Sequence, residues 1–175
     1  LALCYLDGVG AAKDERLAFT WFMKAASSGH PGAQYNVGLC YLNGIGISVK
    51  NEQEGIRWLS MAGGNGSLDA QYNLGVIYAN GFGVPQDHHK AREWFFKSAW
   101  QGDAESMFNL GVSHDRGLGA ERNDIEALAW YRLALQRGFK PALTNIPIVQ
   151  ARMSPSQVEK AYGRAIELIL DHKLP

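Results

Sequence analysis

Four tryptophans and two series of glycines recur along the chain at a nearly constant interval. The tryptophans are Trp21, Trp58, Trp94 and Trp130, which are separated by 37, 36 and 36 residues. The same separations hold for the glycine series Gly29, Gly66, Gly102, Gly138 and for the series Gly8, Gly44, Gly81, Gly117. The extra residue of the longer interval falls between Gly46 and Trp58, where a loop is expected. Each series forms a column of equivalent positions. Three columns that share one insertion indicate internal repeats, and repeats of this length are typical of stacked helical units.

Each repeat contains two segments with the period of an amphipathic α-helix. The first is clearest in AQYNVGLCYLNG (33–44) and AQYNLGVIYANG (70–81), and SMFNLGVSHDRG (106–117) is a third copy. In the first copy the small or apolar positions are Ala33, Val37, Gly38 and Tyr41. No segment has the two-residue period of a β-strand. The pattern therefore predicts helix pairs.

The second helix of each repeat has recognisable start and stop signals. It begins at a column of capping residues, carries the tryptophan, and ends at the glycines 29, 66, 102 and 138 as helices with a C′ glycine do. The capping column is Asp14, Asn51, Asp87 and Asn123. Asn51 with Glu54, and Asn123 with Glu126, have the spacing of a capping box. The tryptophans are expected to pack between helices.

Composition excludes several classes of protein. The 175 residues contain 17 Lys and Arg and 17 Asp and Glu, so neither a nucleic-acid footprint nor a basic membrane-binding face is expected. No apolar run has the length of a membrane span. The two cysteines, Cys4 and Cys40, occupy equivalent positions of neighbouring repeats, which places them too far apart for a disulfide. We expect no cofactor.

The repeats resemble the Sel-one-like repeat (SLR) family, α-solenoid relatives of the tetratricopeptide repeats. The family pattern A-x-x-x-L-G-x-x-Y-x-x-G-x-G-V-x-x-D-x-x-K-A-x-x-W-Y-x-K-A-A-x-x-G is matched almost throughout by residues 70–102, and the resemblance extends from residue 1 to about residue 138. It implies an all-α fold, a right-handed superhelix of about four helix pairs whose first helices line a concave face. It also implies a non-catalytic adaptor that holds another protein.

The repeat boundaries define one solenoid domain over 1–175. The opening LALCYLDG aligns with VGLCYLNG, so the chain is expected to start midway through a first helix. We assign 1–29 to a truncated repeat and 30–66, 67–102 and 103–138 to full repeats. Residues 139–153 form a partial repeat helix in which Pro147 should kink or restart the helix. Residues 154–172, with Ser154 as N-cap, form a capping helix.

The concave face is the candidate binding site. Opposite the packing stripe, at 100° per residue, the predicted partner-binding residues are Tyr35, Asn36, Leu39, Asn43, Tyr72, Asn73, Val76, Asn80, Phe108, Asn109, Val112, Arg116 and Asn145. An asparagine column and an apolar column (Leu3, Leu39, Val76, Val112, Ile148) run through them. Asparagine can both donate to and accept from a peptide backbone. The pattern favours binding of a peptide or helix, and the alternative is that the asparagines only bridge neighbouring helices.

Other motifs are weaker. The recurring G-x-G follows a helix instead of a strand and lacks a G-K-[ST], so it indicates a tight turn and not a phosphate loop. No S-x-x-K, S-D-N, K-T-G or G-x-S-x-G is present. His88, His89 and His114 leave open a metal-binding or hydrolase-like alternative. The competing interpretation is that His114 is a packing residue and that His88 and His89 are simply exposed.

Three further points stay open from sequence. Trp100 replaces small or polar residues of its column and is expected to be exposed, as a possible additional contact or as a single surface aromatic. A self-assembling structural module is a third functional alternative, and the oligomeric state is not indicated. Neither is the location, since a cytoplasmic and a periplasmic or secreted protein are both consistent with the sequence.

Overall fold

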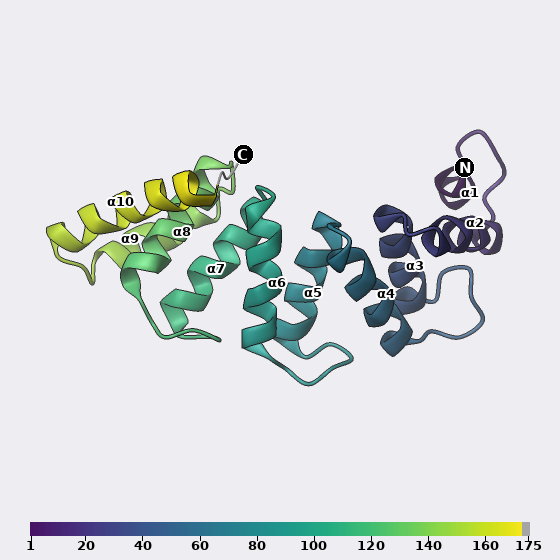
Figure 1. Ribbon diagram of the computed structural model, residues 1–175, viewed down its shortest axis with the longest axis horizontal. Coiled ribbons are helices and arrows are strands. Elements are labelled where there is room, and N and C mark those ends of the chain that lie inside the picture. Colours follow the sequence, from purple (N-terminus) through teal and green to yellow (C-terminus); the bar gives the residue numbers. More distant parts are fainter. Residues whose placement is uncertain (173–175) are drawn as a thin grey trace. The chain divides into compact units, whose positions relative to one another are not determined.

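The structure is a computed structural model that describes residues 1–172, and these residues form ten α-helices and no strand (Figure 1). The helices are α1 (Ala2–Asp7), α2 (Glu15–Ser27), α3 (Pro31–Asn43), α4 (Glu52–Gly64), α5 (Leu68–Asn80), α6 (His88–Trp100), α7 (Ala104–Arg116), α8 (Asp124–Gln136), α9 (Ala142–Gln150) and α10 (Pro155–His172). The all-α fold predicted from the sequence is confirmed. None of these helices is long and apolar enough to cross a membrane.

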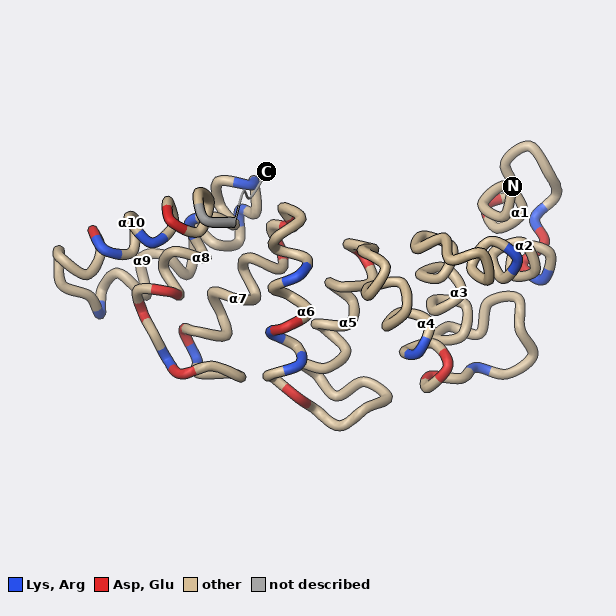
Figure 2. The backbone as a smooth tube through the Cα atoms, in the orientation of Figure 1, with Lys and Arg blue, Asp and Glu red and all other residues tan. Residues whose placement is uncertain are grey.

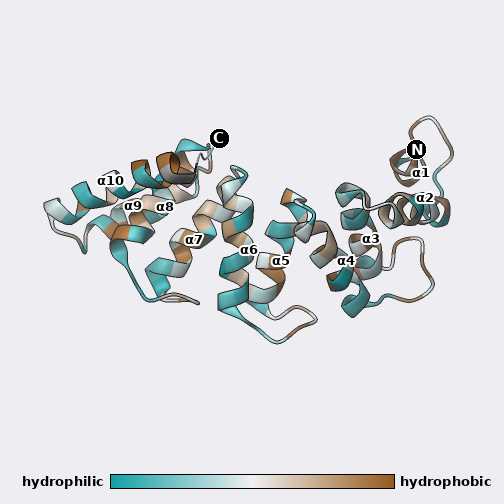
Figure 3. Cartoon of the chain, in the orientation of Figure 1, coloured by the Kyte–Doolittle hydropathy of each residue, from teal (hydrophilic) through white to brown (hydrophobic). Residues whose placement is uncertain are grey.

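The chain divides into two compact units, Leu1–Leu74 and Gly75–Pro175, with the boundary inside α5. The core of the first unit includes buried side chains from α2, α3 and α4, among them Phe22, Val37 and Trp58. In the second unit Trp130 and Tyr131 of α8 are almost fully buried, at 2% and 0% exposure. Hydrophobic and hydrophilic residues are interspersed along the helices (Figure 3), and the loops also carry exposed apolar residues such as Val49 and Phe82. The tryptophan column is only partly core, because Trp21 and Trp94 are half-buried.

The second helices begin where the capping column predicts. The side chains of Asp14, Asn51, Asp87 and Asn123 accept hydrogen bonds from backbone N–H groups of the first helical turn. The predicted capping boxes are only half formed, however. Glu54 pairs with Arg57 at 2.9 Å, and the backbone N–H of Asn51 donates instead to the Tyr41 carbonyl. A reciprocal capping box does occur at α10, where Ser154 and Gln157 bond each other's backbone N–H groups.

Glycines in the first helices let each helix pair pack closely. A Cβ added to Gly38 would lie 2.9 Å from the side chain of Leu59, and one added to Gly111 would lie 2.5 Å from the ring of Tyr131. Leu59 and Tyr131 occupy the same column of the repeat and are both fully buried. The missing side chain on the first helix therefore makes room for a large one on the second.

The second glycine of each G-x-G pair has a structural role. Gly46 and Gly119 have φ values of 69° and 65°, and a Cβ at either position would collide with a backbone carbonyl oxygen, that of Glu15 or of His88. Those carbonyls belong to the first turn of α2 and of α6. The loops after α3 and α7 therefore pack against the second helix of the preceding repeat, as expected for a turn and not for a phosphate loop.

The C-terminal helices depart from the repeat. α9 is 9 residues long instead of the 13 of the regular repeat helices, and it continues through Pro147 as one element instead of restarting. Its first three residues, Ala142, Leu143 and Thr144, donate backbone bonds of the i→i−3 type. α10 packs against α8, and its Arg164 binds Glu126 of α8 at 2.7 Å.

The glycine contacts predict opposite effects for two alanine substitutions. Gly111→Ala should lower the free energy of unfolding by about 1–2 kcal/mol, because overpacking against the buried Tyr131 ring exceeds the gain in helix propensity. Gly163→Ala, in the middle of α10 with nothing within 4 Å, should raise it by up to about 1 kcal/mol. Urea unfolding of the two variants tests this, and a stabilised Gly111→Ala would contradict the close packing.

Candidate functional site

The predicted partner-binding residues lie on first helices and are mostly half-buried. Three of them are exposed, namely Asn43, Asn80 and Arg116. The others are half-buried, namely Tyr35, Asn36, Leu39, Tyr72, Asn73, Val76, Phe108, Asn109, Val112 and Asn145. The ends of the apolar column, Leu3 and Ile148, are both 55% exposed. α3 contains no charged residue and α5 contains only Asp69 (Figure 2). These two helices therefore offer a polar but nearly uncharged surface.

A cavity of about 320 Å³ in the second unit brings four of these residues together. They are Val76 and Asn80 of α5 and Asn109 and Val112 of α7. The remaining lining residues are Ala79, Gln86, His88, Ala91, Phe95, Ser113 and Leu118. The cavity therefore has aliphatic and aromatic walls, with amides, an imidazole and a hydroxyl as its polar groups.

Most of the asparagines use one N–H on their own helix. The side-chain N–H groups of Asn36, Asn43, Asn80 and Asn109 donate to the carbonyl four residues earlier, over 2.7, 3.0, 2.8 and 2.9 Å. This bond fixes the rotamer of each amide. Its carbonyl oxygen and second N–H are then directed away from that bond.

Two asparagines instead bridge helices, which is the alternative left open by the sequence. Asn73 of α5 donates to the Tyr35 hydroxyl of α3 at 3.1 Å, within the first unit. Asn145 of α9 donates to the Tyr131 hydroxyl of α8 at 3.2 Å. The asparagine column is thus not uniform in structure, and Asn73 and Asn145 have packing roles.

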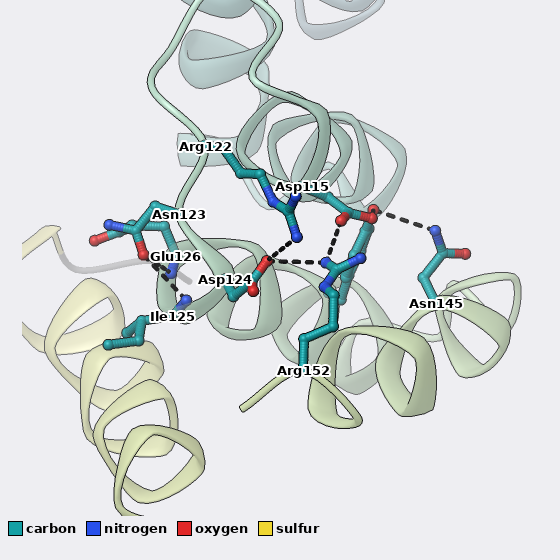
Figure 4. Close-up of polar contacts among 9 residues, drawn as sticks. Asp115, Arg122, Asn123, Asp124, Ile125, Glu126, Asn145 and Arg152 are labelled. Atoms are coloured by element: carbon teal, nitrogen blue, oxygen red, sulfur yellow. Dashed lines mark hydrogen bonds and ion pairs between the residues drawn. The ribbon is translucent and has the colours of Figure 1, made fainter. Parts of the chain in front are cut away.

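A polar network ties the end of α9 to α7 and α8 (Figure 4). Arg152 binds Asp115 of α7 and, at 2.9 Å, Asp124 of α8. The Tyr131 hydroxyl donates to the second oxygen of Asp115 at 3.2 Å. Burial, followed by the Asp115 charge, raises the pKa of Tyr131, so this hydroxyl remains protonated. Sequence reasoning missed the network because Arg152 lies outside the repeat pattern.

The three histidines do not form a metal site in the described part of the chain. No three His, Cys, Asp or Glu side chains there are close enough to hold a metal ion. His89 is exposed, His88 is half-buried at the cavity, and His114 is buried at 8% exposure. Burial lowers the pKa of His114, Arg92 lowers it further, and Glu126 opposes the shift. His114 therefore occupies its position as a neutral imidazole.

The position of Trp100 was predicted wrongly. It is half-buried instead of exposed, because its ring stacks on Phe96 with the centroids 4.0 Å apart and lies 6.0 Å from the ring of Trp130. Phe96, one helical turn earlier, and Trp130, on the next second helix, cover the Trp100 ring. Among its neighbours it is Phe96, at 37% exposure, that reaches solvent.

Two other features bear on chemistry. Cys4 and Cys40 are both free, and burial raises the pKa of Cys40 to about 11, which leaves its thiol protonated and unreactive. Gln34 and Gln71 are buried and donate to the Ala26 and Gly63 carbonyls at the end of the preceding second helix. The repeated AQYN sequence was the available signal for this glutamine contact.

Paired helices in a 36-residue repeat, closed by glycine turns that pack on the preceding repeat, define an α-helical repeat protein of the tetratricopeptide-like class. The chain belongs to the Sel1 repeat family, whose model matches residues 1–30, 31–67, 68–103 and 104–139. Members of this family are generally non-catalytic scaffolds for protein–protein interaction. A search of curated protein sequences gives no significant match.

Solved structures agree with this assignment. A Sel1 repeat protein from Oxalobacter formigenes is 29% identical with a TM-score of 0.79, over 83% of this chain and 59% of that one. A protective antigen of uropathogenic Escherichia coli strains that displays an SLR fold is 30% identical with a TM-score of 0.83, over 98% and 37%. Cysteine rich protein B of Helicobacter pylori is 25% identical with a TM-score of 0.58, over 75% and 94%. The chain thus spans less than two thirds of the first two proteins.

The buried imidazole predicts a pH-dependent stability. The folded state keeps His114 neutral, whereas the unfolded chain binds a proton near the ordinary pKa of 6.5. The contribution of His114 to the free energy of unfolding is therefore complete above pH 6.5 and decreases as the pH falls through that value, by at most about 1.4 kcal/mol per pH unit. His114→Tyr, which restores the residue of the Tyr5, Tyr41 and Tyr78 column, should flatten this slope in urea unfolding.

The control for this experiment is His89→Gln at an exposed position. It should leave the slope between about pH 5 and 7 unchanged, because the His89 side chain is exposed and has no buried packing position to lose. An equal slope in His114→Tyr and in the wild type would contradict the assignment of the pH dependence to His114.

The Arg152 network predicts a local contribution to stability. Arg152→Ala should lower the free energy of unfolding by about 1–2 kcal/mol, since it leaves two partly buried carboxylates without their shared cation. Arg57→Ala is the matched control, because its pair with Glu54 is solvent-exposed and should contribute much less to stability. Urea titrations compare the two, and equal losses would contradict a special role for Arg152.

Proposed function

We propose that the chain is a non-catalytic scaffold that binds a segment of another protein on the groove side of its first helices. The observation that carries the proposal is the cavity between α5 and α7, because Val76, Asn80, Asn109 and Val112 were selected from sequence as binding residues and all four line it. Sequence periodicity and cavity geometry are independent criteria. Their agreement favours this part of the face over the remainder of the predicted site.

The chemistry of the cavity suits a peptide with an uncharged side chain. Valine, alanine and phenylalanine walls would take an aliphatic group, and no lysine, arginine, aspartate or glutamate lines the cavity. The amides of Asn80 and Asn109 are held by bonds to their own helices. Each would offer its free carbonyl oxygen and second N–H to a peptide backbone at little further cost in side-chain entropy.

The alternative functions have less support. A hydrolase or metal protein would use His88, His89 and His114, but one of these is buried, one is exposed and one lies at the cavity. They do not converge on one site among the described residues. For a self-assembling module, no separate observation favours one surface over another as the contact between copies of the chain.

The groove predicts a specific loss of binding. Linear peptides are first selected from a random phage-displayed library on the wild-type protein, and their affinities are then measured by fluorescence anisotropy. Val112→Asp should lower the affinity for the selected peptides by about tenfold or more, because it places a carboxylate in an apolar cavity. Asn109→Ala should weaken them less, by about two- to tenfold, through loss of backbone hydrogen bonds.

The matched control is Ile166→Ser on α10, far along the chain from the cavity and 57% exposed. It should leave the affinities unchanged, and circular dichroism shows whether each variant is folded. Selected peptides that bind Val112→Asp and Asn109→Ala as tightly as the wild type would contradict the proposed site.

A further inference from the structure

A second surface lies on the second helices of the Gly75–Pro175 unit and does not include the cavity between α5 and α7. This surface, here named the second-helix face, consists of Arg92, Phe96 and Trp100 of α6, Arg132 of α8, and Tyr162 and Ile166 of α10. Ring contacts connect its parts, because Phe96 lies 6.1 Å from Trp130 of α8 and the Arg132 guanidinium lies 3.8 Å from the Tyr162 ring. The face therefore has residues on three helices, with one ring contact between α6 and α8 and one cation–ring contact between α8 and α10.

The aromatic residues of this face are peculiar to one repeat. The column of Phe96 otherwise holds Met23, Ser60 and Arg132, and the column of Trp100 otherwise holds Ser27, Gly64 and Gln136. The other regular second helices form without an aromatic residue at either position. Stacking of the two aromatic rings is therefore not a requirement of the repeat.

The two rings form a fixed platform. Phe96 and Trp100 stack at 4.0 Å with an interplanar angle of 30°, above the buried Trp130. Phe96 remains 37% exposed. Rigid, partly exposed aromatic residues of this kind are typical anchors of protein interfaces, because little side-chain freedom is lost on binding.

An apolar cleft lies between α8 and α10. Its volume is about 390 Å³, and Leu133, Leu135, Ile166 and Ile169 supply most of its walls. The only charged residue that lines it is Arg132. Ile166 is 57% exposed and Leu170, one turn later, is 70% exposed. The cleft thus has room for an apolar side chain beside a cation.

The two cavities at this face are lined by three cations, Arg92, Lys97 and Arg132, and by one carboxylate, Glu93. Arg92, Lys97 and Arg132 form no ion pair with any described carboxylate, whereas Arg152 and Arg164 each bind two. Lys97 and Arg132 lie over aromatic rings instead, at 4.1 and 3.8 Å. The Nε atom of Arg92 is buried without a hydrogen-bond partner, in a column that otherwise holds Phe19, Ile56 and Leu128. Unpaired cations beside exposed apolar groups complement an acidic amphipathic partner.

We infer that the second-helix face is a docking site for an acidic amphipathic segment of another protein. An apolar side chain of that segment enters the cleft beside Ile166, and a second one contacts the platform at Phe96. Carboxylates on its flanks pair with Arg92, Lys97 and Arg132. This interaction is separate from the proposed groove, so the scaffold can hold two partners at once.

Two synthetic helical peptides test the inference. Both carry leucines on one face, and the other face is glutamate in the first peptide and lysine in the second. Fluorescence anisotropy at low salt should give an affinity about tenfold or more tighter for the glutamate peptide, and added salt should weaken it. Phe96→Ser and Ile166→Ser should each lower the affinity for the glutamate peptide by about tenfold. Arg132→Glu, a surface change, should reduce the preference for glutamate over lysine.

Phe82→Ser is the matched control, because Phe82 is a 60% exposed aromatic in the same unit and lies outside the face. It should bind the glutamate peptide like the wild type, and so should the groove variant Val112→Asp. Equal binding of the two peptides, no binding, or full binding by folded Phe96→Ser and Arg132→Glu would each overturn the inference. A dimer seen by light scattering that Ile166→Ser disrupts would also overturn it, in favour of a second copy as the occupant.

Discussion

The contact between a glycine of the first helix and a large side chain of the second sets the close spacing of the three regular helix pairs α3/α4, α5/α6 and α7/α8. Gly38 faces Leu59, Gly75 faces Phe95, and Gly111 faces Tyr131, and in each case an added Cβ would come within 3 Å of that side chain. Close approach here buries the large residue and brings the rest of the two helices into register. The capping residue, the C′ glycine and the G-x-G turn then need only connect helices whose separation is already fixed.

Much of this architecture could be predicted because the repeat displays each local constraint several times. A single G-x-G is ambiguous, but its recurrence after an apolar helix, in step with a tryptophan column, identifies it as a turn. Side-chain partners were less predictable. Glu54 and Glu126 have capping-box spacing but bind Arg57 and Arg164, since a carboxylate gains more from a nearby guanidinium than from an exposed backbone N–H. The Arg164 partner lies 38 residues away and has no local signature.

The candidate site was predictable in outline and not in detail for the same reason. Helical periodicity places the asparagine column on one side of the first helices, but it does not say whether an amide will meet a hydroxyl. Asn73 and Asn145 do so because Tyr35 and Tyr131 lie opposite them, whereas Asn80 and Asn109 bond their own helices. Asn36 and Asn43 bond their own helices in the same way and also remain available for recognition, but of these four it is Asn80 and Asn109 that line the cavity.

Functional information in such a chain lies where one repeat departs from the others. In the first unit Phe19 and Tyr41 form an edge-to-face pair between a second helix and the next first helix, 5.6 Å apart. The equivalent residues in the second unit are Arg92 and His114, and the positive charge of Arg92 lowers the pKa of His114. An aromatic pair would suit the packing better than two polar groups with buried, unpartnered nitrogens. The same helix also carries Phe96 and Trp100 where other repeats have small or polar residues. Helix α6 is thus packed less favourably at Arg92 than the equivalent helices, and it carries a cationic and aromatic surface. This arrangement is expected of a helix that binds a partner.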